Sequence, residues 1–235
     1  MARPMFTASK MEPRRIRFKT KRLIEMSIFT PDNEPYLGRQ SVFQFDNMIL
    51  VAMEQNQKIA PWTHGRNLTS LQRAGTELIP HGFSIALSIR ELVRQGYLIG
   101  AEILLRPLIE RAAVISYLSE TPGALPLWGN GWPHKSRPPL HKMLAAMHGT
   151  TGTAQENEDL ARQVTQHFNS LVHADPQGAR NHSIKTGNGL RGYSASKSLS
   201  DTEKCDDICF QAAMYLIILT ARACEIFSEA LGPKH

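Results

Sequence analysis

The chain has 235 residues, of which 42% are hydrophobic, and it carries a formal net charge of +6. This length and apolar content are enough for a substantial core and indicate a soluble globular protein. Three cysteines, Cys205, Cys209 and Cys224, are too few and too close in sequence for a disulfide framework. We therefore expect ordinary core thiols in a protein of the reducing cytoplasm.

The first 38 residues are predicted to form a mobile basic arm. Eight basic residues within the first 22 positions face a single acid, Glu12. These basic residues are Arg3, Lys10, Arg14, Arg15, Arg17, Lys19, Lys21 and Arg22. No continuous apolar run follows them, so they do not form a secretory signal. The arm either follows a phosphate backbone or is a solvated tail.

Apolar residues at helical spacing predict helices along most of residues 39–235, which we expect to form a single domain. In chain order, the predicted helices cover residues 41–60, 68–78, 82–95, 97–119, 140–148, 155–173 and 201–231. Two long loops are expected, at residues 120–139 and 174–200. No stretch shows strand-like alternation flanked by hairpin turns. The fold class is therefore predicted to be all-α, a bundle of four to five helices.

The most apolar stretch, ICFQAAMYLIILTARAC at residues 208–224, raises the question of a membrane span. It is shorter than the ~20 apolar residues that a span requires. It also contains Gln211 and Arg222. We predict a buried core helix and no membrane association.

The predicted helix at residues 97–119 carries a ladder of charges. It is apolar on nearly every side, which is typical of a buried helix, yet Glu102, Arg106 and Glu110 follow one another at intervals of four residues. Arg106 can pair with either carboxylate. Pro107 adds a second irregularity, because a proline inside a helix leaves one backbone carbonyl group without its donor. Two interpretations stay open: a structural lattice of ion pairs and a functional site.

The predicted helix at residues 155–173 has an apolar and a polar face. The apolar stripe consists of Leu160, Val164, His167, Phe168 and Leu171. The opposite face carries Arg162, Gln166, Asn169 and His173. His167 is therefore expected to be a core histidine. His173 lies near the negative end of the helix dipole and is the better candidate for chemistry.

The combination of LLRPLIERAAVISYL with a later helix that ends in FNSLVHADP resembles a broad bacterial family of all-helical domains of unassigned function. More distantly, it resembles the HEPN superfamily of helical bundles. The resemblance covers roughly residues 41–231. It implies a metal-independent endoribonuclease in an antiphage-defence or toxin–antitoxin setting, with an Arg and a His four to six residues apart as the active signature.

Two placements of such a site are compatible with the chain. Arg162 and His167 have the signature spacing, but an ideal helix places these side chains roughly 140° apart. The preferred site consists of Arg106, Glu110, Asn169 and His173. In it, a neutral His173 would take the proton of a 2′-hydroxyl group and Arg106 would stabilise the negative charge of the phosphorane. Glu110 would orient Arg106, and Asn169 would hold the imidazole or a phosphate oxygen.

A non-catalytic helical binding or scaffold protein is the alternative. In that case the Arg106 ladder is structural, and the arm and loops contact a protein or nucleic-acid partner. The sequence contains no phosphate-binding glycine loop, nucleophile elbow, HExxH or zinc ribbon, so no cofactor or metal is expected. RNA is the expected partner through the arm and the second loop. A homodimer is compatible with a helical bundle, although no coiled-coil heptad in the sequence predicts one.

Overall fold

The computed structural model describes residues 34–133, 135–147, 154–173, 176, 184–185, 191–192 and 197–232. The predicted arm therefore lies outside the described residues up to position 33, and so does most of the predicted loop at residues 174–200. The last residues assigned to the arm, 34–38, are described. They form a turn in which Tyr36 is buried against the bundle.

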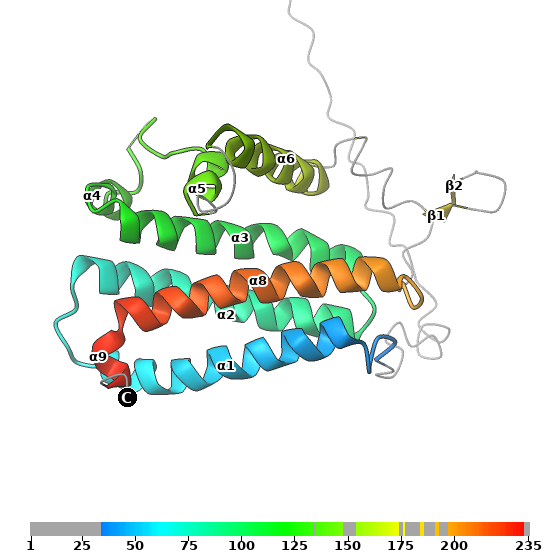
Figure 1. Cartoon of the computed structure of the whole chain (residues 1–235), viewed down its shortest axis with the longest axis horizontal. Coiled ribbons are helices and arrows are strands. Elements are labelled where there is room, and N and C mark those ends of the chain that lie inside the picture. Colours follow the sequence, from blue (N-terminus) through cyan, green and yellow to red (C-terminus); the bar gives the residue numbers. More distant parts are fainter. Residues whose placement is uncertain are drawn as a thin grey trace, which may run out of the picture. The chain divides into compact units, whose positions relative to one another are not determined.

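The fold is all-α, as predicted (Figure 1). Its helices are α1 Gln40–Thr63, α2 Ser70–Arg94, α3 Leu98–Glu120, α4 Ala124–Gly129, α5 Leu140–Met147, α6 Ala154–Val172, α8 Thr202–Ile226 and α9 Ser228–Leu231. The short pairing of β1 Ile184–Lys185 with β2 Arg191–Gly192 is antiparallel. The first of the two predicted loops thus contains a short helix, α4, whose first residue, Ala124, is buried.

Helices α1, α2, α3 and α8 form a bundle, and ion pairs show their directions. Lys204 near the start of α8 binds Glu102 on α3, and Arg222 near its end binds Glu120. Helices α3 and α8 are therefore parallel. Arg90, near the end of α2, binds Asp46, near the start of α1, so these two helices are antiparallel. In Figure 1, α4, α5 and α6 lie on the side of α3 that faces away from α1.

Helix α3 lies at the centre of the core, as its all-round apolar character predicts. Leu105, Leu108, Ile109, Ile115 and Leu118 are each no more than 1% exposed. The helix continues through Pro107 from Leu98 to Glu120. Because α3 is buried on this many sides, its polar residues Glu102, Arg106 and Glu110 are held in fixed positions.

Helix α2 differs from the prediction, which divided it into two helices at residues 68–78 and 82–95. The structure has one continuous helix through Pro80 and Gly82. A Cβ atom at Gly82 would lie 2.5 Å from Cδ1 of the buried Leu219. Gly82 therefore allows α8 to approach α2 closely, and it does not mark a helix end.

The start of α2 is held by a capping box. The Thr69 hydroxyl group accepts a hydrogen bond from the Gln72 amide at 3.2 Å, and the Thr69 amide donates to Gln72 Oε1 at 3.0 Å. We expect Thr69→Ala to lower the free energy of unfolding by about 1 kcal/mol, because the Gln72 amide loses its acceptor. The urea midpoint measures this loss. Thr76→Ala is the control, since its hydroxyl group bonds only the carbonyl of Arg73 within the same helix; equal losses in both variants would contradict the capping role.

Helix α8 begins as predicted, with the Asp201 carboxylate accepting a hydrogen bond from the Lys204 amide at 3.2 Å. It ends earlier than predicted, at Ile226. Phe227, which is 2% exposed, turns into the core before the short α9 begins. By length and composition α8 is apolar enough to cross a membrane, but half of its most apolar part is buried inside the bundle. One side of α8 therefore lies in the core, as predicted, while Phe210 and Ile217 on another side are exposed.

Candidate functional site

Helix α6 packs on α5 and on the outer side of α3. The side chains that it buries there differ from the apolar stripe that the sequence predicts. The buried residues are Ala161, Phe168 and Leu171. Leu160 is 56% exposed, and the His167 side chain is 48% exposed, so His167 is not the predicted core histidine. Because α6 lies at the edge of the bundle, it buries only a narrow stripe of side chains.

The charged ladder of α3 does not form the predicted internal ion pairs. Each of its three side chains finds a partner on another element. Glu102 Oε2 lies 2.5 Å from Lys204 Nζ of α8, and Glu102 Oε1 lies 3.3 Å from His167 Nε2 of α6. The first carboxylate of the ladder is thus bound by residues of two neighbouring helices, α6 and α8.

Glu110, the last member of the ladder, binds two guanidinium groups. Its Oε1 atom pairs with Arg137, which follows α4, and its Oε2 atom lies 3.8 Å from Arg111. The sequence analysis predicts that Glu110 orients Arg106. In the structure Glu110 binds these two other arginines instead.

Arg106 has a different kind of partner. Its guanidinium group donates a hydrogen bond to the side-chain oxygen of Asn169 on α6. Within the described parts of the chain, no carboxylate forms an ion pair with Arg106. The half-buried Arg106 thus carries a positive charge whose partner is neutral, while both neighbouring carboxylates are compensated by other cations.

His173 lies one turn beyond Asn169, at the end of α6. Its amide donates to the Asn169 carbonyl at 3.0 Å, and its side chain is exposed. Residues four apart on a helix lie on the same face, so His173 is on the side of α6 that Asn169 presents to Arg106.

The alternative pair, Arg162 and His167, is divided between two partners. Arg162 binds Glu158 within α6 at 2.7 Å, whereas His167 contacts Glu102 of α3. Among the hydrogen bonds of the described residues, none joins Arg162 to His167. Arg162 and His167 have the spacing of the signature in the sequence, but their side chains do not bind each other in the structure.

Lys204 and Arg137 were missed by sequence reasoning. Lys204 is a single lysine at the start of an apolar helix, and Arg137 lies in a stretch rich in Gly, Pro and Trp. No local pattern distinguishes either residue. Their role depends on the packing of distant segments against α3.

A polar cleft of about 300 Å³ lies beside Glu102, between α3, α6 and α8. Its ionisable lining residues are Glu102, His167, Asp201, Glu203, Lys204 and Asp207. Acids dominate this lining, so the cleft disfavours an anion.

The thiol groups lie apart from this site. Cys205 and Cys209, one turn apart on α8, are both fully buried, which confirms them as core thiols. The hydrogen bond with Cys205 and burial raise the pKa of Cys209. Within the described ranges, no three His, Cys, Asp or Glu side chains are arranged to hold a metal ion.

The fold and this site define an all-helical protein in which no carboxylate of the described residues pairs with the arginine between α3 and α6. Comparison of the chain with protein-family models, with curated proteins and with solved structures gives no match.

Proposed function

We propose that the protein binds a phosphate group of RNA at Arg106 and cleaves the RNA chain without a metal ion. The observation that carries this proposal is the charge balance around Arg106. Glu102 and Glu110, one turn to either side, are paired with Lys204 and Arg137, while Arg106 has the neutral Asn169. A guanidinium group that lacks a carboxylate partner is suited to bidentate binding of a phosphate.

The chemistry requires a base and a fixed cation. His173, exposed at the end of α6, would take the proton of the 2′-hydroxyl group, and the 2′-oxygen would attack the phosphorus. The bond from phosphorus to the 5′-oxygen would break, water would supply the proton to that oxygen, and a 2′,3′-cyclic phosphate would remain. Arg106 would stabilise the extra negative charge of the transition state.

Asn169 is a positioning residue in this proposal. Its side chain holds one edge of the Arg106 guanidinium group, and it lies one helical turn before His173. Asn169 would therefore keep Arg106 beside the side of α6 on which His173 lies. Glu110 has a different role from the one that the sequence suggested. Its ion pair with Arg137 would hold that cation beside the face of α3 that carries Arg106 and Glu110, and so add positive charge near the phosphate.

A non-catalytic binding protein is the second candidate. The Arg106–Asn169 hydrogen bond and the Glu102–His167 contact both fasten α6 to α3, which is what a purely structural ladder would do. The two candidates differ in what happens to RNA.

The test is cleavage of end-labelled single-stranded RNA in excess EDTA. We expect the wild-type protein to cleave, and both His173→Ala and Arg106→Ala to abolish cleavage while the variants stay folded by circular dichroism. Arg162→Ala is the matched control. Arg162 is an exposed arginine of α6, and it pairs with Glu158 of the same helix. Absence of cleavage by the wild type, or cleavage that persists in both variants, would rule out a ribonuclease at Arg106.

A further inference from the structure

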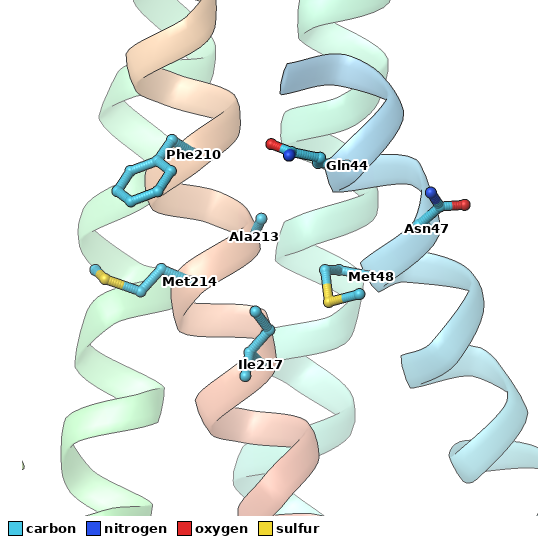
Figure 2. A pocket seen from close by; sticks show the side chains of 7 residues that line it. All are labelled: Gln44, Asn47, Met48, Phe210, Ala213, Met214 and Ile217. Atoms are coloured by element: carbon cyan, nitrogen blue, oxygen red, sulfur yellow. The ribbon is translucent and has the colours of Figure 1, made fainter. Parts of the chain in front are cut away.

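Helices α1 and α8 form an apolar groove of about 360 Å³ on a side of the bundle that α3 and α6 do not line. The lining consists of Gln44, Asn47 and Met48 from α1 and of Phe210, Ala213, Met214 and Ile217 from α8 (Figure 2). Phe210 is 66% exposed and Ile217 is 50% exposed. Among the described residues, none of the side chains that line the groove is charged.

The outward residues of α8 have the spacing that fits another helix. Phe210, Met214, Ile217 and Ala221 follow at intervals of four, three and four residues, and each is exposed or half-buried. Figure 2 shows Phe210 and Met214 projecting from the same side of α8. This alternation is the spacing at which one helix presents a seam to a second helix.

The apolar surface continues onto α1. Phe43 and Leu50 lie one turn before and one turn after Asn47, and they are 60% and 66% exposed. Both helices therefore present large apolar side chains to solvent along the groove. Single exposed apolar residues are common, but several large ones on two adjacent helices beside an apolar groove mark an interaction surface.

We propose that a second copy of this chain docks on the groove, with its α8 antiparallel to α8 of the first copy about a twofold axis near Met214. In such a contact the same surface of both copies meets, so a lining charged with one sign would oppose like charges. This lining carries none. The arrangement places Phe210 against Ile217 of the second copy, and the acidic Asp207 against the uncharged Ala221.

The size of the surface agrees with a dimer. Helices α1 and α8 contain 24 and 25 residues, so at 1.5 Å per residue each is about 36 Å long. Two adjacent helices, each about 10 Å wide, then offer a face of about 700 Å² per copy. A standard stable interface buries about 800 Å² per partner.

Sedimentation velocity of the full chain tests this proposal. We expect a dimer that dissociates on dilution, and at least about a hundredfold weaker association for Phe210→Glu or Ile217→Glu, since each copy would bury an unpaired charge. Leu160→Glu, at a 56% exposed leucine of α6, is the control and should leave the dimer unchanged. A wild-type protein that is monomeric at every concentration would overturn the proposal, as would a dimer that Phe210→Glu does not weaken.

A cross-link locates the twofold axis. Met214→Cys should form a disulfide-linked dimer under mild oxidation, because the two introduced thiols would lie beside the axis. Leu160→Cys is the control for random collision, and the wild type is the control for the native cysteines, of which Cys205 and Cys209 are buried. Equal cross-linking of the Met214→Cys and Leu160→Cys proteins would show that the copies associate through another face.

Arg106 and Asn169 do not line the groove, so RNA cleavage by the Phe210→Glu variant is measured independently of its association.

Discussion

Replacing Gly96 by alanine should lower the free energy of unfolding by about 2 to 4 kcal/mol, because two separate penalties apply at this position. Gly96 has φ +78°, in the left-handed region that alanine adopts only with strain. A Cβ atom there would also lie 2.8 Å from the carbonyl oxygen of Ser198. Backbone cannot yield to a Cβ atom as a flexible side chain can, so the segment before α8 must move.

The contacts around Gly96 explain why this movement is expensive. The Tyr97 amide donates to the Leu92 carbonyl at 2.8 Å, and the Gly96 amide donates to the Val93 carbonyl at 3.0 Å, which together close the end of α2. The Gly96 carbonyl in turn accepts from the Ser198 amide at 2.9 Å. The turn between α2 and α3 is therefore directly joined to the segment that leads into α8.

Ser198 also holds the start of the described chain. Its carbonyl oxygen accepts a hydrogen bond of 2.7 Å from the hydroxyl group of the buried Tyr36. Displacing Ser198 would thus break one bond to Gly96 and one to Tyr36. Both losses add to the strain at φ.

Gly65→Ala is the matched control for the Gly96 variant. Gly65 has φ +71°, yet a Cβ atom there would meet nothing within 4 Å. It should therefore show only the backbone strain, about 1 to 2 kcal/mol. Urea unfolding of both variants separates the two penalties, and equal losses would show that the approach of Ser198 contributes nothing.

The sequence predicts the helices well where apolar spacing is uninterrupted. Helix α3 and the start of α8 agree closely with their predicted ranges, since a buried helix and an aspartate cap are local features. Helix α2 was divided wrongly because Pro80 and Gly82 are local signals of interruption. The role of Gly82 is set by Leu219, on a helix more than a hundred residues later in the chain.

The candidate site was predictable only as separate halves. A polar residue on an all-apolar helix draws attention to Arg106, and the polar face of α6 draws attention to Asn169. That the two side chains meet is a property of packing between segments 63 residues apart. The same holds for Lys204 and Arg137, which compensate the carboxylates of the ladder from outside α3.

The exposure of His167 could not be predicted for a similar reason. Periodicity shows which side chains share a face of α6, but it does not show how wide a stripe the neighbouring helices cover. Phe168 is 3% exposed and the adjacent His167 is about half-exposed, so the edge of the contact falls between them. That edge is set by where α3 and α5 lie.

Asn169→Asp should change stability and RNA cleavage in opposite directions, if the function proposed for Arg106 holds. The change places a carboxylate where Arg106 now has a neutral amide oxygen, with almost no change in shape. Hydrogen bonds between charged groups are stronger than neutral ones, so the free energy of unfolding should rise by up to about 1 kcal/mol. Arg106 and Asn169 are only half-buried, and solvent screening keeps this gain small.

Cleavage should fall at least about tenfold in the same variant, because a phosphate group would have to compete with a fixed carboxylate for the guanidinium group. Asn169→Leu is the control, since it removes the hydrogen bond without adding charge; it should lower stability and reduce cleavage through loss of positioning. A structural ladder predicts otherwise. If Arg106 serves only to fasten α6 to α3, Asn169→Asp should stabilise the protein and leave its affinity for RNA unchanged, as measured by fluorescence anisotropy at low salt. The sign of the two changes in one variant therefore distinguishes an anion site from a structural ion-pair position.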